Sequence, residues 1–238
     1  MRVVMLHTPD FLPSDISVPV AQAYCRRWGY PFDHYYALIR PEWVPAWNKV
    51  LAVQSAMRIA NESEWIAWID ADVLILRQDF ALESFLVEGK DLLFSTDHKG
   101  LCTGFFLIRK CATMQRFLQH LCSNYCTTWP WEQTAAKNII AAAPHHQRTI
   151  AYISSSIIQN PRSIFHADAF AMHYWANGRS YLKTKESMLL ALQHGWKKGF
   201  LDISSGSVAW DLEFARYEIE HREQIFRGSI ASRFSLGG

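Results

Sequence analysis

The segment Trp65-Ile66-Ala67-Trp68-Ile69-Asp70-Ala71-Asp72-Val73-Leu74-Ile75-Leu76 decides the fold class of this chain. Residues 65–69 form an apolar run between two acidic residues, which is typical of a strand buried on both faces of a sheet. An unpaired carboxylate inside such a strand would be strongly destabilising, so we expect Asp70 and Asp72 to lie where the strand emerges. Ligands of open α/β sheets gather at that carboxyl edge.

Apolar runs and helical patterns alternate on either side of this segment. Strands are predicted at 3–7, 32–38, 64–69, 91–95, 104–109 and 165–175. Helices are predicted at 18–28, 47–59, 81–87, 112–125, 132–142, 183–194 and 211–226. This order favours an α/β fold with a mostly parallel sheet covered by helices on both faces. A Ser/Gly stretch at 204–207 indicates a linker, so we predict one α/β domain at 1–203 and a helical appendage at 204–238.

Composition narrows the possible partners and compartments. The 238 residues carry 24 Lys+Arg and 22 Asp+Glu, a net charge of +2, and no basic run reaches five residues, so nucleic acid is not an expected partner. Five cysteines without a C-x-x-C pair, no signal-peptide core and no long apolar run lead us to expect a cytoplasmic protein. Residues 196–200 and 211–226 mix aromatic and charged side chains, but five acidic residues in the second segment oppose peripheral membrane contact.

The spacing of Asp70 and Asp72 indicates a particular chemistry. In extended backbone, residues two positions apart point the same way with Cα atoms roughly 6 to 7 Å apart, so both carboxylates can address one cation. Carboxylate oxygens suit Mg²⁺ or Mn²⁺, which neutralises charge on a leaving diphosphate. The pair therefore indicates a nucleotide-diphosphate site. The alternative is a structural pair that caps a helix or ends a strand.

Four motifs in a fixed order carry a resemblance to a known family. They are Trp47-Asn48-Lys49; Trp68-Ile69-Asp70-Ala71-Asp72; Thr103-Gly104-Phe105-Phe106-Leu107-Ile108-Arg109; and Glu132-Gln133 followed by His173 and Asn177-Gly178. Over roughly residues 3–178 the chain resembles the GT-A nucleotide-diphospho-sugar transferases, in particular glycosyltransferase family 34. The resemblance implies metal-dependent transfer of a sugar from a nucleoside-diphosphate sugar, in particular a UDP-sugar, to a glycan acceptor with retention of configuration.

The resemblance also implies roles for individual residues. Asp70 would lie near the ribose and the metal, Asp72 would be a direct metal ligand and His173 the third; from the strand pattern alone, His173 would be a buried core histidine. An imidazole ligand suits Mn²⁺ better than Mg²⁺, so manganese is the expected ion. Donor-binding roles are implied for His7, Thr8, Lys49, Thr103, Gly104 and Gly178.

Glu132 and Gln133 are the catalytic candidates. The family holds an acidic-Gln step on the far side of the donor sugar from the diphosphate, where it could stabilise an oxocarbenium-like transition state. The alternative is that Glu132 only stabilises its helix N-terminus. Where the family has asparagine before Thr-Gly, this chain has Cys102, a change that bears on the contact with the donor sugar.

Two other functions share part of this pattern. A haloacid-dehalogenase-like phosphatase also places D-x-D after an apolar strand, but it requires the pair in its first strand, followed by Gly-Thr, whereas Val73 and Leu74 follow here. A nucleotide-sugar or glycan-binding module without turnover is the second alternative. Turnover of a nucleotide sugar with metal would distinguish an enzyme from such a module.

Overall fold

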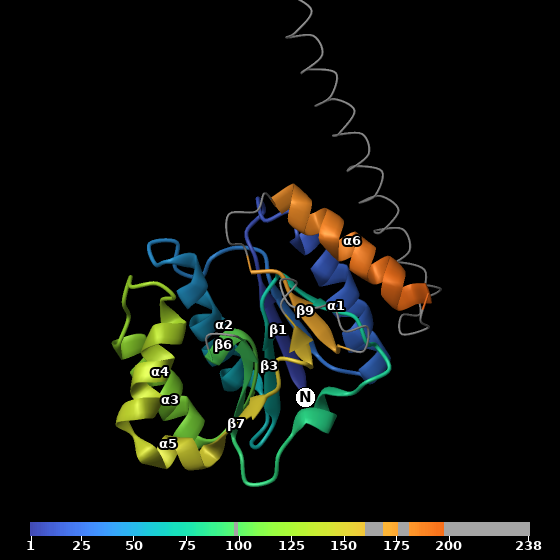
Figure 1. Cartoon of the computed structure of the whole chain (residues 1–238). Coiled ribbons are helices and arrows are strands. Elements are labelled where there is room, and N and C mark those ends of the chain that lie inside the picture. The colour runs from blue at the N-terminus through green and yellow to red at the C-terminus, as the bar shows by residue number, and fades with distance from the viewer. Residues whose placement is uncertain (98–99, 160–168, 176–180, 198–238) are drawn as a thin grey trace, which may run out of the picture.

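The computed structural model describes residues 1–97, 100–159, 169–175 and 181–197, coloured in Figure 1. These residues form one α/β domain. Several predictions concern residues outside the described part of the chain, namely the domain boundary at 203, the appendage at 204–238 and its helix at 211–226. The two segments considered for membrane contact, 196–200 and 211–226, also lie outside it, apart from residues 196 and 197. None of the described helices is long and apolar enough to cross a membrane.

The centre of the domain is a six-stranded sheet in the order β2-β1-β3-β6-β5-β7. Its strands are β1 (Arg2–Leu6), β2 (Phe32–Tyr35), β3 (Trp65–Ile69), β5 (Leu92–Asp97), β6 (Gly100–Arg109) and β7 (Ile150–Ile153). Only β6 runs antiparallel to its two neighbours, and the other described pairings in this sheet are parallel. The predicted mostly parallel sheet is therefore confirmed.

Helices cover both faces of this sheet (Figure 1). Val3 and Met5 of β1 join the core cluster shared with α1 (Ser14–Trp28) and α6 (Tyr181–Lys197). Val4, between them, joins the cluster of α2 (Asn48–Ile59), α3 (Ala112–Ser123) and α4 (Glu132–Ala142). Because successive side chains of a strand point to opposite faces, β1 contributes to the hydrophobic core on each side of the sheet. The remaining helices are η1 (Pro45–Trp47), η2 (Leu82–Phe85) and α5 (Pro144–Thr149).

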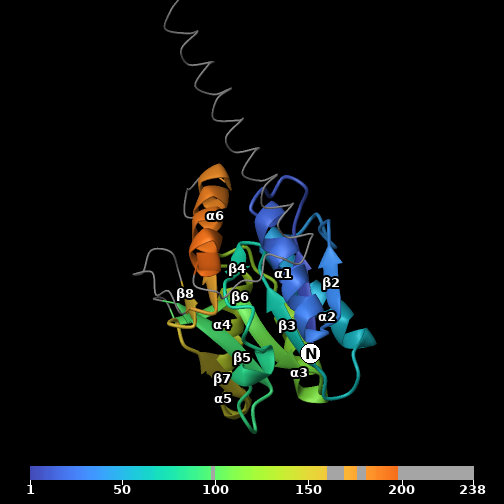
Figure 2. The same ribbon diagram turned by 90° about the vertical axis from the view of Figure 1, so that its right-hand side faces the viewer.

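A second sheet of three short strands lies beside the first. It has the order β4-β9-β8, with β4 (Val73–Ile75), β8 (Ile158–Gln159) and β9 (Ala171–His173). Helices α1 and α6 lie side by side next to it (Figure 2), joined by the Lys185 Nζ to Asp15 Oδ2 ion pair at 2.7 Å. Its strands β4 and β9 place residues from two distant parts of the sequence beside the end of β3.

The structure corrects several predicted boundaries. The strand expected at 165–175 is confined, within the described residues, to β9, and the strand expected at 32–38 ends at Tyr35. The helix expected at 81–87 is the short 3₁₀ helix η2, and α1 begins at Ser14 rather than at residue 18. Strands β4, β7 and β8 and helix α5 were not predicted. Gly29 follows the last residue of α1, with a φ of 68° that glycine adopts without strain.

Candidate active site

The two aspartates lie on a turn, which corrects the extended geometry predicted for them. Strand β3 ends at Ile69, and the Val73 N–H donates to the Asp70 carbonyl oxygen at 2.8 Å, closing a turn over Asp70–Val73. The Ser17 hydroxyl of α1 donates to the Ala71 carbonyl oxygen at 2.5 Å and holds the middle of the turn. The carboxylates therefore converge because the chain reverses between β3 and β4, and not because of strand alternation.

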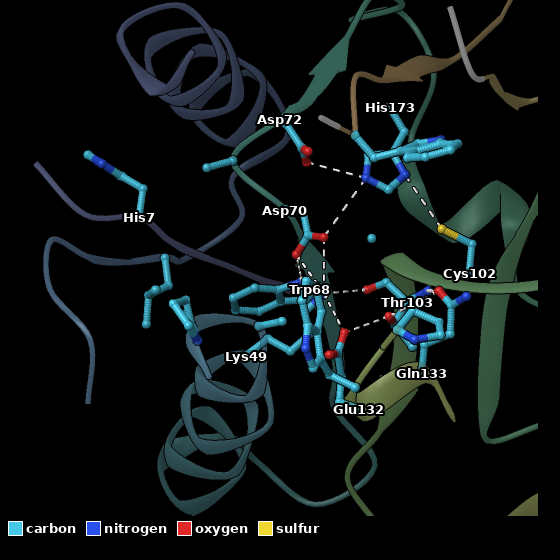
Figure 3. Close-up of a pocket in the computed structure, with 18 of the residues that line it drawn as sticks. His7, Lys49, Trp68, Asp70, Asp72, Cys102, Thr103, Glu132, Gln133 and His173 are labelled. Atoms are coloured by element: carbon cyan, nitrogen blue, oxygen red, sulfur yellow. Dashed lines mark hydrogen bonds and ion pairs between the residues drawn. The ribbon is translucent and has the colours of Figure 1, made fainter. Parts of the chain in front are cut away.

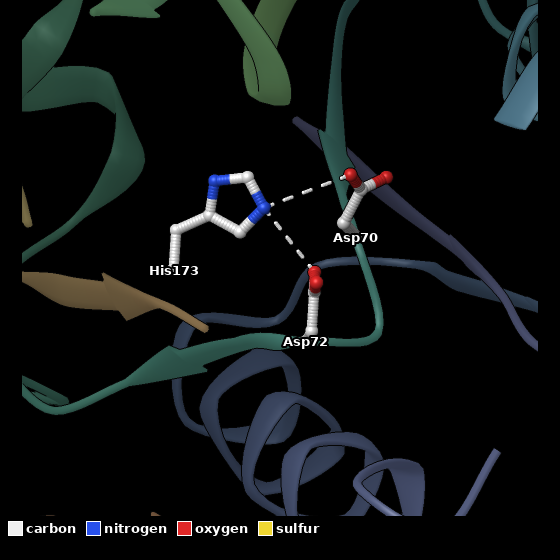
Figure 4. A group of neighbouring side chains, drawn as sticks. All are labelled: Asp70, Asp72 and His173. Carbon is white, nitrogen blue, oxygen red and sulfur yellow. Dashed lines mark ion pairs between the residues drawn. The ribbon is translucent and has the colours of Figure 1, made fainter. Parts of the chain in front are cut away.

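His173 completes a group of three possible metal ligands with these aspartates. In the β4–β9 pairing, Val73 stands opposite His173. His173 Nε2 lies 3.3 Å from Asp72 Oδ1 and 3.9 Å from Asp70 Oδ2 (Figure 4). One ligand atom from each residue lies within 4.8 Å of the others. The three residues thus have the spacing needed to hold one cation.

The charges of these three residues depend on one another. Burial lowers the pKa of an imidazole, but the Asp72 carboxylate and the contact with Cys102 raise the pKa of His173 well above its usual 6.5. Burial raises the pKa of a carboxyl, yet the neighbouring His173 holds the pKa of Asp72 below its usual value. Burial dominates at Asp70 and raises its pKa despite Lys49. Because a metal-ligating imidazole is neutral, a bound cation would replace the His173 proton.

Lys49 is a buried cation beneath Asp70. Its Nζ lies 2.9 Å from Asp70 Oδ1, 3.0 Å from Glu132 Oε1 and 3.3 Å from the Thr103 carbonyl oxygen. Burial alone would lower the pKa of Lys49, but the two carboxylates raise it above its usual value. Lys49 therefore stays charged, and only 6% of the residue is exposed, so it does not lie on a solvated helix face.

A bulge in β6 ties the first turn of α4 to this network. Phe94 of β5 pairs with Phe106 and Ser95 pairs with Cys102, so residues 103–105 have no partner on β5. The Thr103 hydroxyl donates to Glu132 Oε1 at 2.8 Å, and the Thr103 N–H donates to Gln133 Oε1 at 3.1 Å. Bulges of this kind re-aim side chains next to active sites. Here the bulge brings α4 and α2 together through Thr103.

These side chains line one cavity of about 420 Å³, shown in Figure 3. All but one of the predicted site residues line it, namely His7, Thr8, Lys49, Asp70, Asp72, Thr103, Gly104, Glu132, Gln133 and His173. Gly178 lies outside the described residues, and its role stays a prediction. His7 stands at the end of β1, where its ring stacks on His34 at 4.9 Å between centroids and meets the edge of Tyr36 at 4.9 Å.

Other residues of the cavity were not assigned from the sequence. The Trp68 indole N–H donates to Asp70 Oδ1 at 2.7 Å. The sequence could have indicated this contact, because residues two positions apart along a strand point to the same face. Phe11 and Tyr181 meet edge to face at 5.0 Å and also line the cavity. Nothing in the local sequence signals this pair, since it joins segments 170 residues apart.

Comparisons of sequence confirm the resemblance to family 34. Residues 16–92, which include Lys49, Asp70 and Asp72, match the model of the galactosyl transferase GMA12/MNN10 family. Probable glycosyltransferase 6 of Oryza sativa subsp. indica is 34% identical over 97 residues, covering 37% of this chain and 20% of that protein. Putative glycosyltransferase 7 of Arabidopsis thaliana is also 34% identical over 97 residues, covering 22% of its length. The match thus spans about a fifth of the length of these curated relatives.

Comparison of structures shows the GT-A fold. A glycosyltransferase involved in the glycosylation of the major capsid of PBCV-1 superposes with a TM-score of 0.65 at 15% identity, covering 80% of this chain and 100% of that one. The glycosyltransferase GlyE of Streptococcus pneumoniae superposes with a TM-score of 0.51 at 12% identity, covering 84% of this chain and 65% of that one. At 15% and 12% identity, these likenesses show the fold alone.

The expected cytoplasmic location is wrong. Family 34 glycosyltransferases and the plant relatives are typically membrane-anchored enzymes of the Golgi lumen. The inference rested on the cysteine count and on the residues at the start of this chain. Neither observation determines the cellular compartment. Free thiols also occur outside the cytoplasm, and the sequence match spans only part of the relatives' length.

Proposed function

We propose that the chain, which has a GT-A fold and matches the family 34 model over residues 16–92, transfers a sugar from a nucleoside-diphosphate sugar to a glycan acceptor. One observation carries this proposal: the ligand atoms of Asp70, Asp72 and His173 converge within 4.8 Å beside a cavity of about 420 Å³. Ligand pockets commonly enclose about 300 to 1,000 Å³, so this cavity has the capacity for such a donor. The site also lies at the carboxyl end of β3, the edge where α/β sheets bind ligands.

The residues present fit a divalent cation. They supply two carboxylates and one imidazole, a donor set that suits Mn²⁺ better than Mg²⁺. Lys49 balances one of the three carboxylates of Asp70, Asp72 and Glu132, so two negative charges are left when His173 is neutral. A bound divalent cation would supply electrostatic stabilisation of the leaving diphosphate. We infer that Asp70, Asp72 and His173 would hold the ion, with Asp70 also bound by Lys49 and Trp68.

The remaining pocket residues would bind and orient the donor. His7 and Thr8, at the end of β1, are proposed to bind the nucleobase and ribose, and the ring cluster of His7, His34 and Tyr36 supports this because it is aromatic and partly exposed. Thr103 and Gly104 line the cavity beside the aspartates and are proposed to contact the sugar. The use of a UDP-sugar and retention of configuration are proposed on the family resemblance.

Glu132 and Gln133 are proposed to act on the donor sugar. Glu132 is 3% exposed, and its Oε1 atom is already bound by Lys49 and Thr103. Its Oε2 atom is buried and has no hydrogen-bond partner among the described residues. A carboxylate held in this way needs no reorganisation to stabilise positive charge at the anomeric carbon. Since Lys49 also bridges to Asp70, Glu132 is linked to the proposed metal site as well.

A panel of nucleotide sugars tests the proposal. We expect one donor to raise the melting temperature only with Mn²⁺ and then to be consumed. At roughly a hundred times its Kd, a ligand that binds only the folded state stabilises it by about 2.7 kcal/mol. Asp72→Asn should remove both effects, whereas the control Asp79→Asn should not, because Asp79 pairs with Arg77 and does not line the cavity. Binding without turnover would instead favour a binding module.

A further inference from the structure

The imidazole of His173 sits against two neighbours that are not proposed metal ligands. Cys102 Sγ lies 3.5 Å from His173 Nδ1, and Cys102 is 5% exposed. Gly104 lies against the ring itself: a Cβ at this position would be 2.2 Å from His173 Cε1 and 2.7 Å from each ring nitrogen. Figure 3 shows Cys102 on the side of the ring away from the aspartates. We call Cys102 and Gly104 the histidine seat.

The backbone of the seat is fixed by hydrogen bonds on both sides. The Ser95 hydroxyl donates to the Cys102 carbonyl oxygen at 3.2 Å, and the Asp70 N–H donates to the Gly104 carbonyl oxygen at 2.8 Å. The second bond joins the seat to the turn that carries the aspartates. His173 is held separately, by the pairing of β9 with β4. The histidine seat therefore belongs to the six-stranded sheet and His173 to the three-stranded sheet. How closely they pack depends on the size and chemistry of the side chains at positions 102, 104 and 173.

We propose that Cys102 and Gly104 are positioning residues that direct Nε2 of His173 toward the cation held with Asp70 and Asp72. In the neutral imidazole only one nitrogen carries a hydrogen. When Nδ1 carries it, the N–H can donate to Cys102 Sγ, and the Nε2 lone pair is left for the cation. Figure 4 shows the corresponding arrangement, with one ring nitrogen toward both aspartates and the other away from them. This inference rests on the metal site of the proposed function.

Gly104 has a distinct part in the arrangement. A methyl group 2.2 Å from Cε1 is closer than any real contact, so Gly104→Ala must displace the imidazole or the β6 backbone. Among the described glycines, 29, 89 and 100 have open space at the Cβ position, whereas Gly104 does not. The glycine is therefore required by the ring that lies on it, whether or not it also contacts a donor sugar.

Mn²⁺ affinity, measured by calorimetry or by electron paramagnetic resonance, tests the Cys102 half of the seat. Groups that orient metal-bound histidines typically contribute 10- to 100-fold to affinity. Because sulfur is a weak acceptor, we expect Cys102→Ala to weaken Mn²⁺ binding by about tenfold, and Cys102→Ser to retain most of it. Cys122→Ala is the matched control, since this thiol contacts Gln54 and does not line the cavity. Equal affinity in Cys102→Ala and the wild type would overturn this half.

A double-mutant cycle tests the Gly104 half. We expect Gly104→Ala to weaken Mn²⁺ binding about as much as His173→Ala does, and to lower the melting temperature. In a His173→Ala background the added methyl group meets no ring, so Gly104→Ala should then change neither quantity appreciably. Additive effects of the two substitutions would overturn the inference, because they would mean that Gly104 acts independently of His173.

The spectrum of the metal-free protein provides a readout that needs neither metal nor activity. With ¹⁵N-labelled histidine, the His173 signals are identified by their loss in His173→Ala. We expect them to shift in Cys102→Ala and in Gly104→Ala, but not in Cys122→Ala. A wild-type protein that bound no Mn²⁺ would contradict the proposed metal site itself. Normal Mn²⁺ binding with unshifted His173 signals in both seat variants would overturn the seat and leave the metal site intact.

Discussion

Replacement of Lys49 by methionine perturbs the charge network at its centre. The Nζ atom lies 2.9 Å from Asp70 and 3.0 Å from Glu132, and the residue is 6% exposed. Methionine keeps much of the side-chain volume and removes the charge, which leaves two carboxylates without their cation. Breaking a buried ion pair by removing one partner costs about 3 to 5 kcal/mol. We therefore expect the free energy of unfolding of the metal-free protein to fall by about that amount at neutral pH.

Urea unfolding followed by tryptophan fluorescence, with a chelator present, measures this loss. For a chain of this size, 1 kcal/mol corresponds to about 2 to 4 °C, so the melting temperature should fall by roughly 6 to 20 °C. Lys90→Met is the matched control, because the Lys90 Nζ donates to the Arg148 carbonyl oxygen in an exposed setting. Its loss should cost less than about 1 kcal/mol. A similarly small loss for Lys49→Met would mean that the ion pairs of Lys49 with Asp70 and Glu132 contribute little to stability.

A second substitution tests whether the loss comes from unpaired charge. Glu132→Gln in the Lys49→Met background removes one of the two uncompensated carboxylates at almost constant volume. The double variant should therefore be more stable than Lys49→Met alone, although Glu132→Gln by itself should destabilise the wild type. A double variant that is less stable than Lys49→Met would mean that cavity formation, and not charge, causes the loss.

Three further predictions concern catalysis and pH. Glu132→Gln or Gln133→Ala should lower kcat on the order of a hundredfold with little change in donor Kd, and normal kcat in both would remove the pair from catalysis. Apparent Mn²⁺ affinity should rise by about tenfold per pH unit below the raised pKa of His173, because binding releases its proton; calorimetry showing a flat profile would contradict this. Without metal, the raised folded-state pKa means that His173 contributes stability that is fully present below about pH 6.5. This contribution should be lost as pH rises through the folded-state pKa and should be absent from the unfolding curves of His173→Ala.

Local sequence patterns were sufficient for the core of the fold. The apolar run at 65–69 predicts β3 because a strand buried on both faces leaves no room for polar residues. Glu132 predicts the start of α4, since a carboxylate is favoured at a helix N-terminus. Strand β4 was missed because its partner β9 lies about a hundred residues further along the chain. Short strands of this kind depend on pairing that local periodicity does not contain.

The site was predictable only in part for the same reason. The motif order of the family brought Asp70, Asp72 and His173 together, whereas the strand pattern alone would make His173 a core histidine. The burial of Lys49 depends on Glu132, which is 83 positions away in the sequence. The contact of Cys102 with His173 requires the β6 bulge and the second sheet together. Such contacts between distant segments determine the electrostatics of the site.

Calorimetric titration of UDP into the purified protein, with and without Mn²⁺, tests whether Asp70, Asp72 and His173 hold a divalent cation that binds the diphosphate of the donor. We predict that Mn²⁺ strengthens UDP binding to the wild type and that Asp72→Asn or His173→Ala removes this gain, while Asp79→Asn retains it. UDP affinity that is the same with and without Mn²⁺, or a Mn²⁺ gain that survives in both site variants, would contradict a metal site at these three residues.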